Sequence, residues 1–498
     1  MSMQRRATLA LIALSAALAV ATGPAQAQSR KDSLVLGMVL EPSSLDPTTA
    51  AAAAIGEVVH YNIFEGLTKI GVDGTVTPLL AQDWSESPDG TSYTFRLRKG
   101  VTFSDGSPLT ADAVKFSFER AKAADSKNKA KKAVFDNISL ITVVDPLTVI
   151  LTLNRADPTM PFRLGENTAV ILHPATAAAA ATAPVGTGPY KLTDWKKGSA
   201  ITLTARADAR VKPAIQRVTF RMINDQAAQV AALLAGDIDG MPRFAAFQSL
   251  KQFQADKRFT VEIGTTAGKG QLTINNKKKP FDDVRVRRAI MHAIDRKAFI
   301  DGVLEGLAKP IGSHFAPTDT GYVDLTGKYP YDPEKAKALL KEAGVATPLN
   351  VTLTLPPPPY ARKGGEVVAA MLAKVGIVAK IENVEWAQWL SGPFKGNFDL
   401  TIINHVEPLD YMQYTNKEYY WGYSSKTFDD IVKAHAGTTN PGERSRYWSQ
   451  MQRQLTDDAV NAWIFNPAQV AVAKKGLKGL WASSPIFAND IAAVRWGQ

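Results

Sequence analysis

The segment 351–383 has the pattern of a strand, a helix and a second strand. Val351–Leu355 and Ile377–Asn383 are typical of strands, and Glu366–Val375 between them is typical of a helix. A helix that connects neighbouring strands in this way returns the chain to the same end of the sheet, so the strands run parallel. The segment therefore predicts an α/β fold, to which Asp399–Asn404 adds another strand.

Other elements are marked by turn and capping residues. Asp332-Pro333-Glu334 predicts a helix start, because Asp can cap and Pro suits the first helical position, and Gly344 predicts the end of that helix. Asn440-Pro441 predicts a second helix, through Leu455. In the first half we expect strands at Leu34–Leu40 and Tyr93–Arg98, a helix capped by Thr110, and a hairpin of Ile138–Val144 and Thr148–Leu153.

Length and composition limit the class of protein. The 498 residues exceed what one hydrophobic core usually serves, so two or three domains are expected. The chain contains no cysteine. Disulfide scaffolds, cysteine-ligated zinc, iron–sulfur clusters and thiol nucleophiles are therefore excluded.

The first 27 residues have the pattern of a secretory signal. Arg5-Arg6 precede the apolar run Ala7–Ala21, and Ala25-Gln26-Ala27 supplies small residues for cleavage. A membrane anchor is the alternative, but the run is short for a span and Gly23-Pro24 break it. No cysteine stands at the cleavage point, so we expect no lipoprotein anchor. The sequence predicts a soluble protein exported to the periplasm.

The charge balance is basic. Against 47 acidic residues stand 58 Lys and Arg, a formal charge of +11, and removal of the signal with its two arginines leaves +9. Such an excess can steer anionic ligands or favour nucleic acid. Export and the lack of an aromatic-interleaved basic motif argue against nucleic acid. Basic runs such as Lys277-Lys278-Lys279 are interpreted as a solvated face.

Motifs of catalysis and cofactor binding are missing. Gly264–Gly270 is one residue short of a phosphate loop and has Gly where Ser or Thr would bind Mg²⁺, so it predicts a turn. Gly186-Thr187-Gly188-Pro189 lacks the third Gly of a dinucleotide loop. The six histidines have no metal-ligand spacing. We expect no enzyme activity, no cofactor and no metal site.

One long segment carries a family resemblance. Ala81–Arg120 reads AQDWSESPDGTSYTFRLRKGVTFSDGSPLTADAVKFSFER, and Tyr61–Leu67, Gly186–Tyr190, Pro280–Arg287 and Tyr331–Ala336 supply further motifs in order. This set resembles the ABC-importer solute-binding proteins of bacterial extracellular solute-binding family 5, the dipeptide, oligopeptide and nickel type. The resemblance covers essentially the whole chain after residue 27.

The resemblance implies a two-lobed periplasmic-binding-protein fold, type II-like, with an extra domain inserted in the first lobe. Carried onto this chain, lobe I comprises residues 28–68, 187–268 and 467–498, the inserted domain 69–186, and lobe II 269–466. The ligand would be buried between the lobes, and hinge closure would present the closed form to an ABC permease and its ATPase. We expect a monomer.

The resemblance also indicates where the ligand sits. Relatives that bind peptides hold the α-ammonium with an acid that follows the strand here predicted at Asp399–Asn404. Glu407 and Asp410 are the two candidates, and Glu407-Pro408 resembles the family's Asp-Pro step. An ammonium in a closed cleft needs such a carboxylate, because an unpaired buried charge is costly.

Aromatic and polar residues complete the candidate site. Amphipathic aromatics suit a pocket that binds apolar bulk and still forms hydrogen bonds. The candidates are Tyr411, Tyr420, Trp421, Trp386, Trp389, His405, Arg362 and Asn275.

One departure concerns the ligand carboxylate. Dipeptide-binding relatives place an Arg after the strand that here is Val351–Leu355, but this chain has Pro356–Pro359 there, and Arg362 follows later. The leading hypothesis is capture of a peptide or peptide-like solute for ABC import. Alternatives are a binder of an opine, a modified sugar or a nickel chelate near His405, and a secreted hydrolase on the same scaffold.

Overall fold

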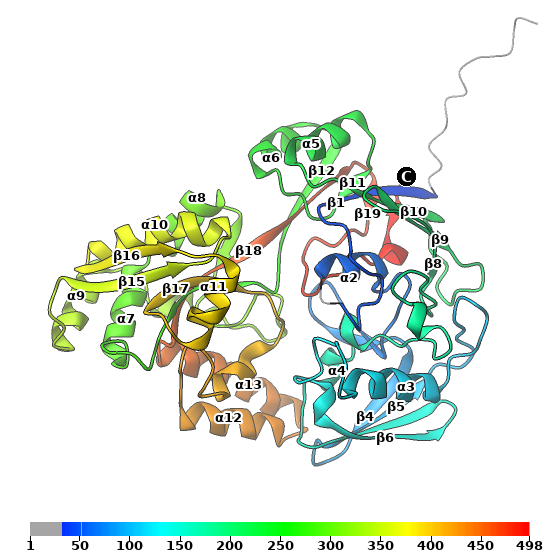
Figure 1. The fold of residues 1–498 in the computed structure, drawn as a ribbon, viewed down its shortest axis with the longest axis horizontal. Coiled ribbons are helices and arrows are strands. Elements are labelled where there is room, and N and C mark those ends of the chain that lie inside the picture. Colours follow the sequence, from blue (N-terminus) through cyan, green and yellow to red (C-terminus); the bar gives the residue numbers. More distant parts are fainter. Residues whose placement is uncertain (1–31, 51, 498) are drawn as a thin grey trace, which may run out of the picture.

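The chain folds into two halves that a long strand joins (Figure 1). The computed structural model describes residues 32–50 and 52–497. The predicted signal segment 1–27 therefore lies outside the described residues. Within the described residues, no helix is long and apolar enough to cross a membrane.

The first half contains one end of a twelve-stranded sheet, with strand order β11-β1-β10-β9-β8. β1 (Ser33–Met38) pairs in parallel with β10 (Arg217–Met222) and confirms the predicted strand near Leu34. The other elements here are α2 (Ala53–Val59), β8 (Tyr190–Lys196), β9 (Ala200–Ala205), α5 (Gln226–Ala235), β11 (Gly240–Met241), α6 (Leu250–Ala255) and β12 (Phe259–Thr265).

A separate four-stranded sheet packs beside this half, in the order β4-β5-β7-β6. Its strands are β4 (Ala81–Glu86), β5 (Ser92–Leu97), β6 (Ile138–Asp145) and β7 (Thr148–Leu153). The predicted hairpin and the alternating strand at Tyr93 are confirmed. α3 (Ala111–Lys122) begins after Thr110 as predicted, but the Thr110 side chain makes no capping hydrogen bond. Shorter elements are β2 (Thr68–Ile70), β3 (Val76–Pro78) and α4 (Met160–Arg163).

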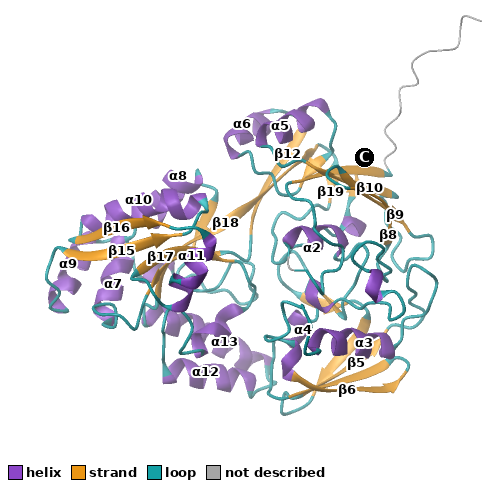
Figure 2. Ribbon diagram, viewed as in Figure 1, coloured by secondary structure: helices purple, strands orange, loops and turns teal. Residues whose placement is uncertain are grey.

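The second half carries the predicted parallel unit. β15 (Leu349–Leu355) and β16 (Ile377–Asn383) pair in parallel, and β17 (Leu400–His405) and β13 (Lys269–Ile274) continue the sheet. The connecting helix begins at Pro359 rather than at the predicted Glu366, because proline fits the first helical turn. The helices are α7 (Val284–Ala293), α8 (Arg296–Leu304), α9 (Pro333–Glu342), α10 (Pro359–Ala373), α11 (Trp386–Ser391), α12 (Lys426–Ala436) and α13 (Pro441–Asp457). Figure 2 shows them around the strands of this half.

Two chain segments cross between the halves. β18 (Asn461–Lys474) pairs with β13 and β14 (Ala308–Pro310) in the second half, and with β11 and β12 in the first. Residues 266–268 make the second crossing, from β12 to β13. The turn predicted in Gly264–Gly270 is wrong, because this segment contains the end of β12 and the start of β13 and passes from one half to the other. Asn466 of β18 links the two crossings. Its Nδ2 donates hydrogen bonds to the carbonyl oxygens of Thr266 and Gly268 in the second crossing, at 2.7 Å each.

The hydrophobic cores follow the same division. The second half has one large core, the four-stranded sheet has its own, and the remainder of the first half has three. The described elements fit the proposed lobes, while the exact domain boundaries stay a prediction. In the C-terminal segment, β19 (Leu477–Lys478) and β20 (Arg495–Trp496) form one short antiparallel pair.

Candidate functional site

A cavity of about 1440 Å³ lies between the two halves, next to the crossing segments. One wall comes from the second half and the other from the first half and the segment before α4. Its lining includes Asn404, Val406–Gln413, Arg155–Thr159, Arg163, Arg243–Ala245, Phe247, Thr266–Gly268, Pro467–Val470 and Ser484–Phe487. The cleft between lobes that the resemblance implies is therefore present.

The loop Val406–Asp410 projects from the end of β17 toward this cavity. Pro408 cannot donate a hydrogen bond to a continuing strand, which suits the chain turning away here. Val406 and Glu407 are exposed, whereas the Asp410 side chain is only 8% exposed. The two candidate acids therefore have different environments.

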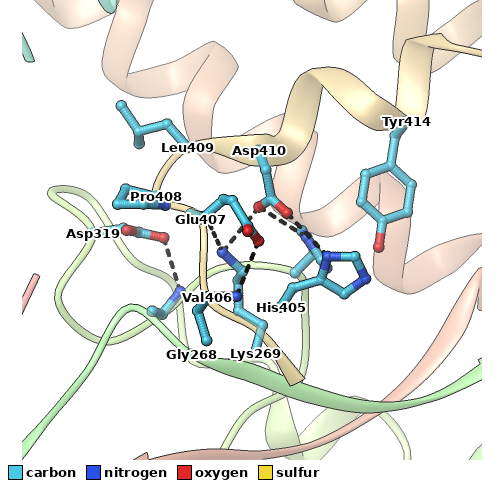
Figure 3. A network of polar contacts seen from close by, with 12 residues as sticks. Gly268, Lys269, Asp319, His405, Val406, Glu407, Pro408, Leu409, Asp410 and Tyr414 are labelled. Carbon is cyan, nitrogen blue, oxygen red and sulfur yellow. Dashed lines mark hydrogen bonds and ion pairs between the residues drawn. The ribbon is translucent and has the colours of Figure 1, made fainter. Parts of the chain in front are cut away.

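Asp410 is the centre of an internal polar cluster (Figure 3). Its Oδ1 lies 2.9 Å from Lys269 Nζ and 3.0 Å from His314 Nε2, and its Oδ2 lies 3.4 Å from His405 Nδ1. Lys269 Nζ also donates to the Glu407 carbonyl oxygen at 2.6 Å. The Lys269 side chain is 1% exposed, so its charge depends on these partners.

The pKa values in this cluster identify which groups are charged. Burial alone would raise the pKa of Asp410, but His314 and Lys269 outweigh burial and hold it well below its ordinary value. Burial lowers the pKa of His314 to about 4, so this imidazole is neutral at pH 7. The Lys269 ammonium, 2.9 Å from Asp410 Oδ1, is a cationic partner for this carboxylate. Burial raises the pKa of nearby Asp319 to about 6.

His314, His405 and Asp410 also place three possible metal-ligand atoms within 4.8 Å of one another. The donor types would suit a transition metal. However, the Lys269 ammonium already lies against the same Asp410 oxygen. A divalent cation there would be brought next to a buried positive charge, so the cluster fits its internal ammonium better than a metal.

The aromatic candidates pack around this cluster. Tyr414 and Trp421 are stacked with ring centroids 4.3 Å apart, and the His314 ring contacts both. Tyr420 OH lies 2.8 Å from His405 Nε2. These rings pack against the two histidines of the cluster and so support the loop that carries Asp410.

Only some of the predicted site residues line the cavity. Glu407, Asp410 and Tyr411 line it. Outside its lining lie Tyr420, Trp421, Trp386, Trp389, His405, Arg362 and Asn275. Arg362 Nη2 lies 2.9 Å from Glu385 Oε1, and Asn275 Nδ2 donates to the carbonyl oxygens of Gly396 and Phe398. Trp386 is 43% exposed on α11, whereas Trp389 is buried beneath it.

Several lining residues were missed by the sequence interpretation. Arg243 and Phe247 supply the opposite wall, and Arg163 and Glu166 approach from beside α4. They stand in segments without a motif, and only the fold brings them to the cleft. Lys129 and Lys132, from a lysine-rich stretch of the sequence, also line the cavity.

Comparisons with known proteins agree with this geometry. Residues 75–427 match the family model for bacterial extracellular solute-binding proteins, family 5. The chain is 29% identical to the dipeptide-binding protein of Escherichia coli (strain K12), over 88% of this chain and 90% of that protein.

Two solved structures share the fold. A periplasmic binding protein from A. tumefaciens R10 in complex with agropinic acid has a TM-score of 0.75 at 26% identity, covering 94% of this chain and 99% of that chain. An ABC transporter-associated periplasmic binding protein from Helicobacter pylori, in complex with the peptide STSA, has a TM-score of 0.73 at 26% identity, covering 94% and 98%.

These matches confirm the two-lobed α/β fold and the family resemblance. The family consists of solute-binding proteins, so the chain binds a solute and is not an enzyme. The chain belongs to the bacterial extracellular solute-binding proteins, family 5.

Proposed function

We propose that the protein captures a peptide or peptide-like solute between its lobes and delivers it to an ABC permease and ATPase at the inner membrane. The observation that carries the peptide assignment is the Glu407 carboxylate. It belongs to an exposed residue lining the cavity, and no cationic side chain of the described residues is paired with it. A peptide's α-ammonium is the complementary group.

Asp410 is less suited to bind the ligand ammonium. Its carboxylate already contacts Lys269, His314 and His405. A ligand ammonium at Asp410 would have to displace or face the Lys269 ammonium. We therefore assign the ligand ammonium to Glu407 and a structural role to Asp410.

Closure of the lobes is proposed to follow ligand binding. The two crossings lie side by side next to the cavity, as a hinge between lobes requires. A ligand favours the closed form only by the difference between its affinities for the closed and open forms. Contacts from both walls, such as Glu407 on one side and Arg243 on the other, would supply that difference.

The alternative is a non-peptide solute. The similarity to the agropinic acid complex supports an opine, and Arg362 lies outside the cavity lining, away from a dipeptide carboxylate. A nickel chelate held by His405 is less well supported, because His405 is buried against Asp410 and Tyr420.

Binding measurements distinguish these ligands. The purified chain should be stripped of bound solute by partial unfolding and tested with di- to tetrapeptides, opines, oligosaccharides and nickel chelates. A ligand at a hundredfold excess over its Kd should stabilise the protein by about 2.7 kcal/mol. If no peptide changes the melting curve and none co-purifies by native mass spectrometry, the peptide proposal is wrong.

The acid assignment has its own test. Glu407→Gln should weaken binding of a free-amino peptide about a hundredfold, because one charge-assisted contact is worth about 3 kcal/mol. Glu262→Gln, at an exposed position of β12 outside the cavity lining, serves as the control. Unchanged affinity in Glu407→Gln would contradict the assignment.

Export is also part of the proposal. Residues 1–27 would act as a cleavable signal, and the mature protein would be periplasmic, monomeric, without a lipid anchor and without a nucleic-acid partner. The Arg5-Arg6 start, the apolar run and the lack of cysteine support this. The N-terminal mass of the protein from a periplasmic fraction and light scattering on that fraction test it.

A further inference from the structure

The ligand loop 406–410 is held by side chains from both sides of the cleft. From its own lobe, Lys269 binds the Glu407 carbonyl oxygen and the Asp410 carboxylate. From the other side comes Arg163, the last residue of α4, which Figure 1 shows in the half opposite β17. The loop is therefore a contact point between the two halves.

Arg163 makes a two-pronged contact with the loop backbone. Its Nη1 donates to the Pro408 carbonyl oxygen and its Nη2 to the Leu409 carbonyl oxygen, both at 3.0 Å. Glu166 Oε2 lies 3.3 Å from Nη1. The Arg163 side chain is 14% exposed, so these hydrogen bonds are largely shielded from water.

The loop conformation needs such support. Leu409 has φ = 54°, in the left-handed region that a branched side chain disfavours. Lys269 fixes the carbonyl of Glu407 and Arg163 fixes those of Pro408 and Leu409, so three successive carbonyls have charged donors. The Glu407 side chain stands on this restrained backbone, and its Oε2 accepts a hydrogen bond from the Val406 N–H at 3.2 Å.

We propose that Arg163 is a positioning residue for ligand recognition, which orients the Glu407 carboxylate from across the cleft through the backbone of the loop. This inference rests on the proposed role of Glu407. A carboxylate on a restrained loop loses less conformational freedom when it binds an ammonium, and this raises affinity. Arg163 therefore contributes to selectivity for ligands with a free amino group.

The chain offers a matched control in Arg444. Its guanidinium also bridges the halves, from α13 to Glu86 of β4, with Nη1 2.8 Å from Oε2 and Nη2 2.5 Å from Oε1. Within the described residues, its hydrogen bonds and ion pairs do not reach loop 406–410, and it does not line the cavity. Arg444→Ala therefore removes a bridging arginine without releasing the ligand loop.

The first experiment needs no ligand. Amide hydrogen exchange in the ligand-free full chain should be at least tenfold faster for Val406, whose N–H donates to Glu407 Oε2 at 3.2 Å, in Arg163→Ala than in the wild type. Arg444→Ala should leave exchange of the Val406 amide unchanged, and Arg163→Lys, which keeps a charged donor, should restore part of the protection. Equal exchange in the wild type and Arg163→Ala would overturn the proposal.

The second experiment measures selectivity by calorimetry, as the Kd of N-acetyl-trialanine divided by the Kd of trialanine. Arg163→Ala should reduce this ratio about tenfold, Arg163→Lys less, and Arg444→Ala not at all. If Glu407→Gln reduces the ratio and Arg163→Ala does not, only the role of Arg163 is wrong. If Glu407→Gln leaves it unchanged, or neither peptide binds, the role of Glu407 fails and the inference fails with it.

Discussion

Replacement of Asp410 by Asn would leave the Lys269 ammonium in the protein interior without its counter-charge. The Lys269 side chain is 1% exposed, and its remaining acceptor would be the Glu407 carbonyl oxygen. His314 cannot compensate, because an imidazole supplies no negative charge. Removing one partner of a buried ion pair typically costs about 3–5 kcal/mol, and we expect a loss in this range for Asp410→Asn.

Urea unfolding at pH 7 measures this loss, and a double-mutant cycle isolates the pair. Lys269→Met removes the ammonium with a side chain of similar length. Asp410→Asn combined with Lys269→Met leaves no unpaired charge, so the double variant should be at least 2 kcal/mol more stable than the sum of the single losses predicts. A loss below about 1 kcal/mol in Asp410→Asn, or additive losses, would refute the assignment of a buried structural pair.

The pH dependence gives a second check on the same pair. The pKa of Asp410 is lower in the folded protein than in the unfolded chain, so its contribution is complete above the ordinary aspartate value. The contribution is lost as the pH falls through the lowered pKa. The stability difference between the wild type and Asp410→Asn should therefore stay constant from pH 7 to 5 and shrink below pH 4.

Two further predictions concern stability. Burial lowers the pKa of His60 to about 3 and of His314 and His435 to about 4, so these rings must gain protons on unfolding as the pH falls below 6.5. The free energy of unfolding should therefore fall between pH 6.5 and 4, by on the order of 3 kcal/mol for His435 alone. In urea titrations, His435→Gln should show a shallower fall of this free energy with pH. The same pH dependence in the wild type and the variant would contradict the prediction. Gly188→Ala should destabilise the protein by about 3 kcal/mol, because the new Cβ would lie 2.4 Å from the Asn62 carbonyl oxygen. Gly302→Ala, where the new Cβ would meet open space on α8, should not destabilise it. Equal melting temperatures for the two variants would contradict this prediction.

The elements predicted correctly are those whose signals are local. The β15–α10–β16 unit depends on apolar runs and turn residues within 35 positions, and Asp332 caps α9 as its sequence indicates. The family motifs were informative for a different reason. Gly188 and Tyr190 donate backbone hydrogen bonds to Ile63 and Asn62, so two motifs more than 120 residues apart are one packed unit.

The candidate site was only partly predictable, because its chemistry depends on contacts between distant segments. The sequence indicated two acids three positions apart, and the Glu407-Pro408 step favoured Glu407. What separates them is Lys269, 141 positions before Asp410, which reaches the loop only because β13 and β17 are neighbours in the sheet. The opposite wall posed the same difficulty, since Arg163 stands 245 positions before the Pro408 carbonyl that it binds. A charged residue in a loop is therefore a candidate ligand contact only after its internal partners are known, and the unpaired acid, Glu407, is the better candidate here.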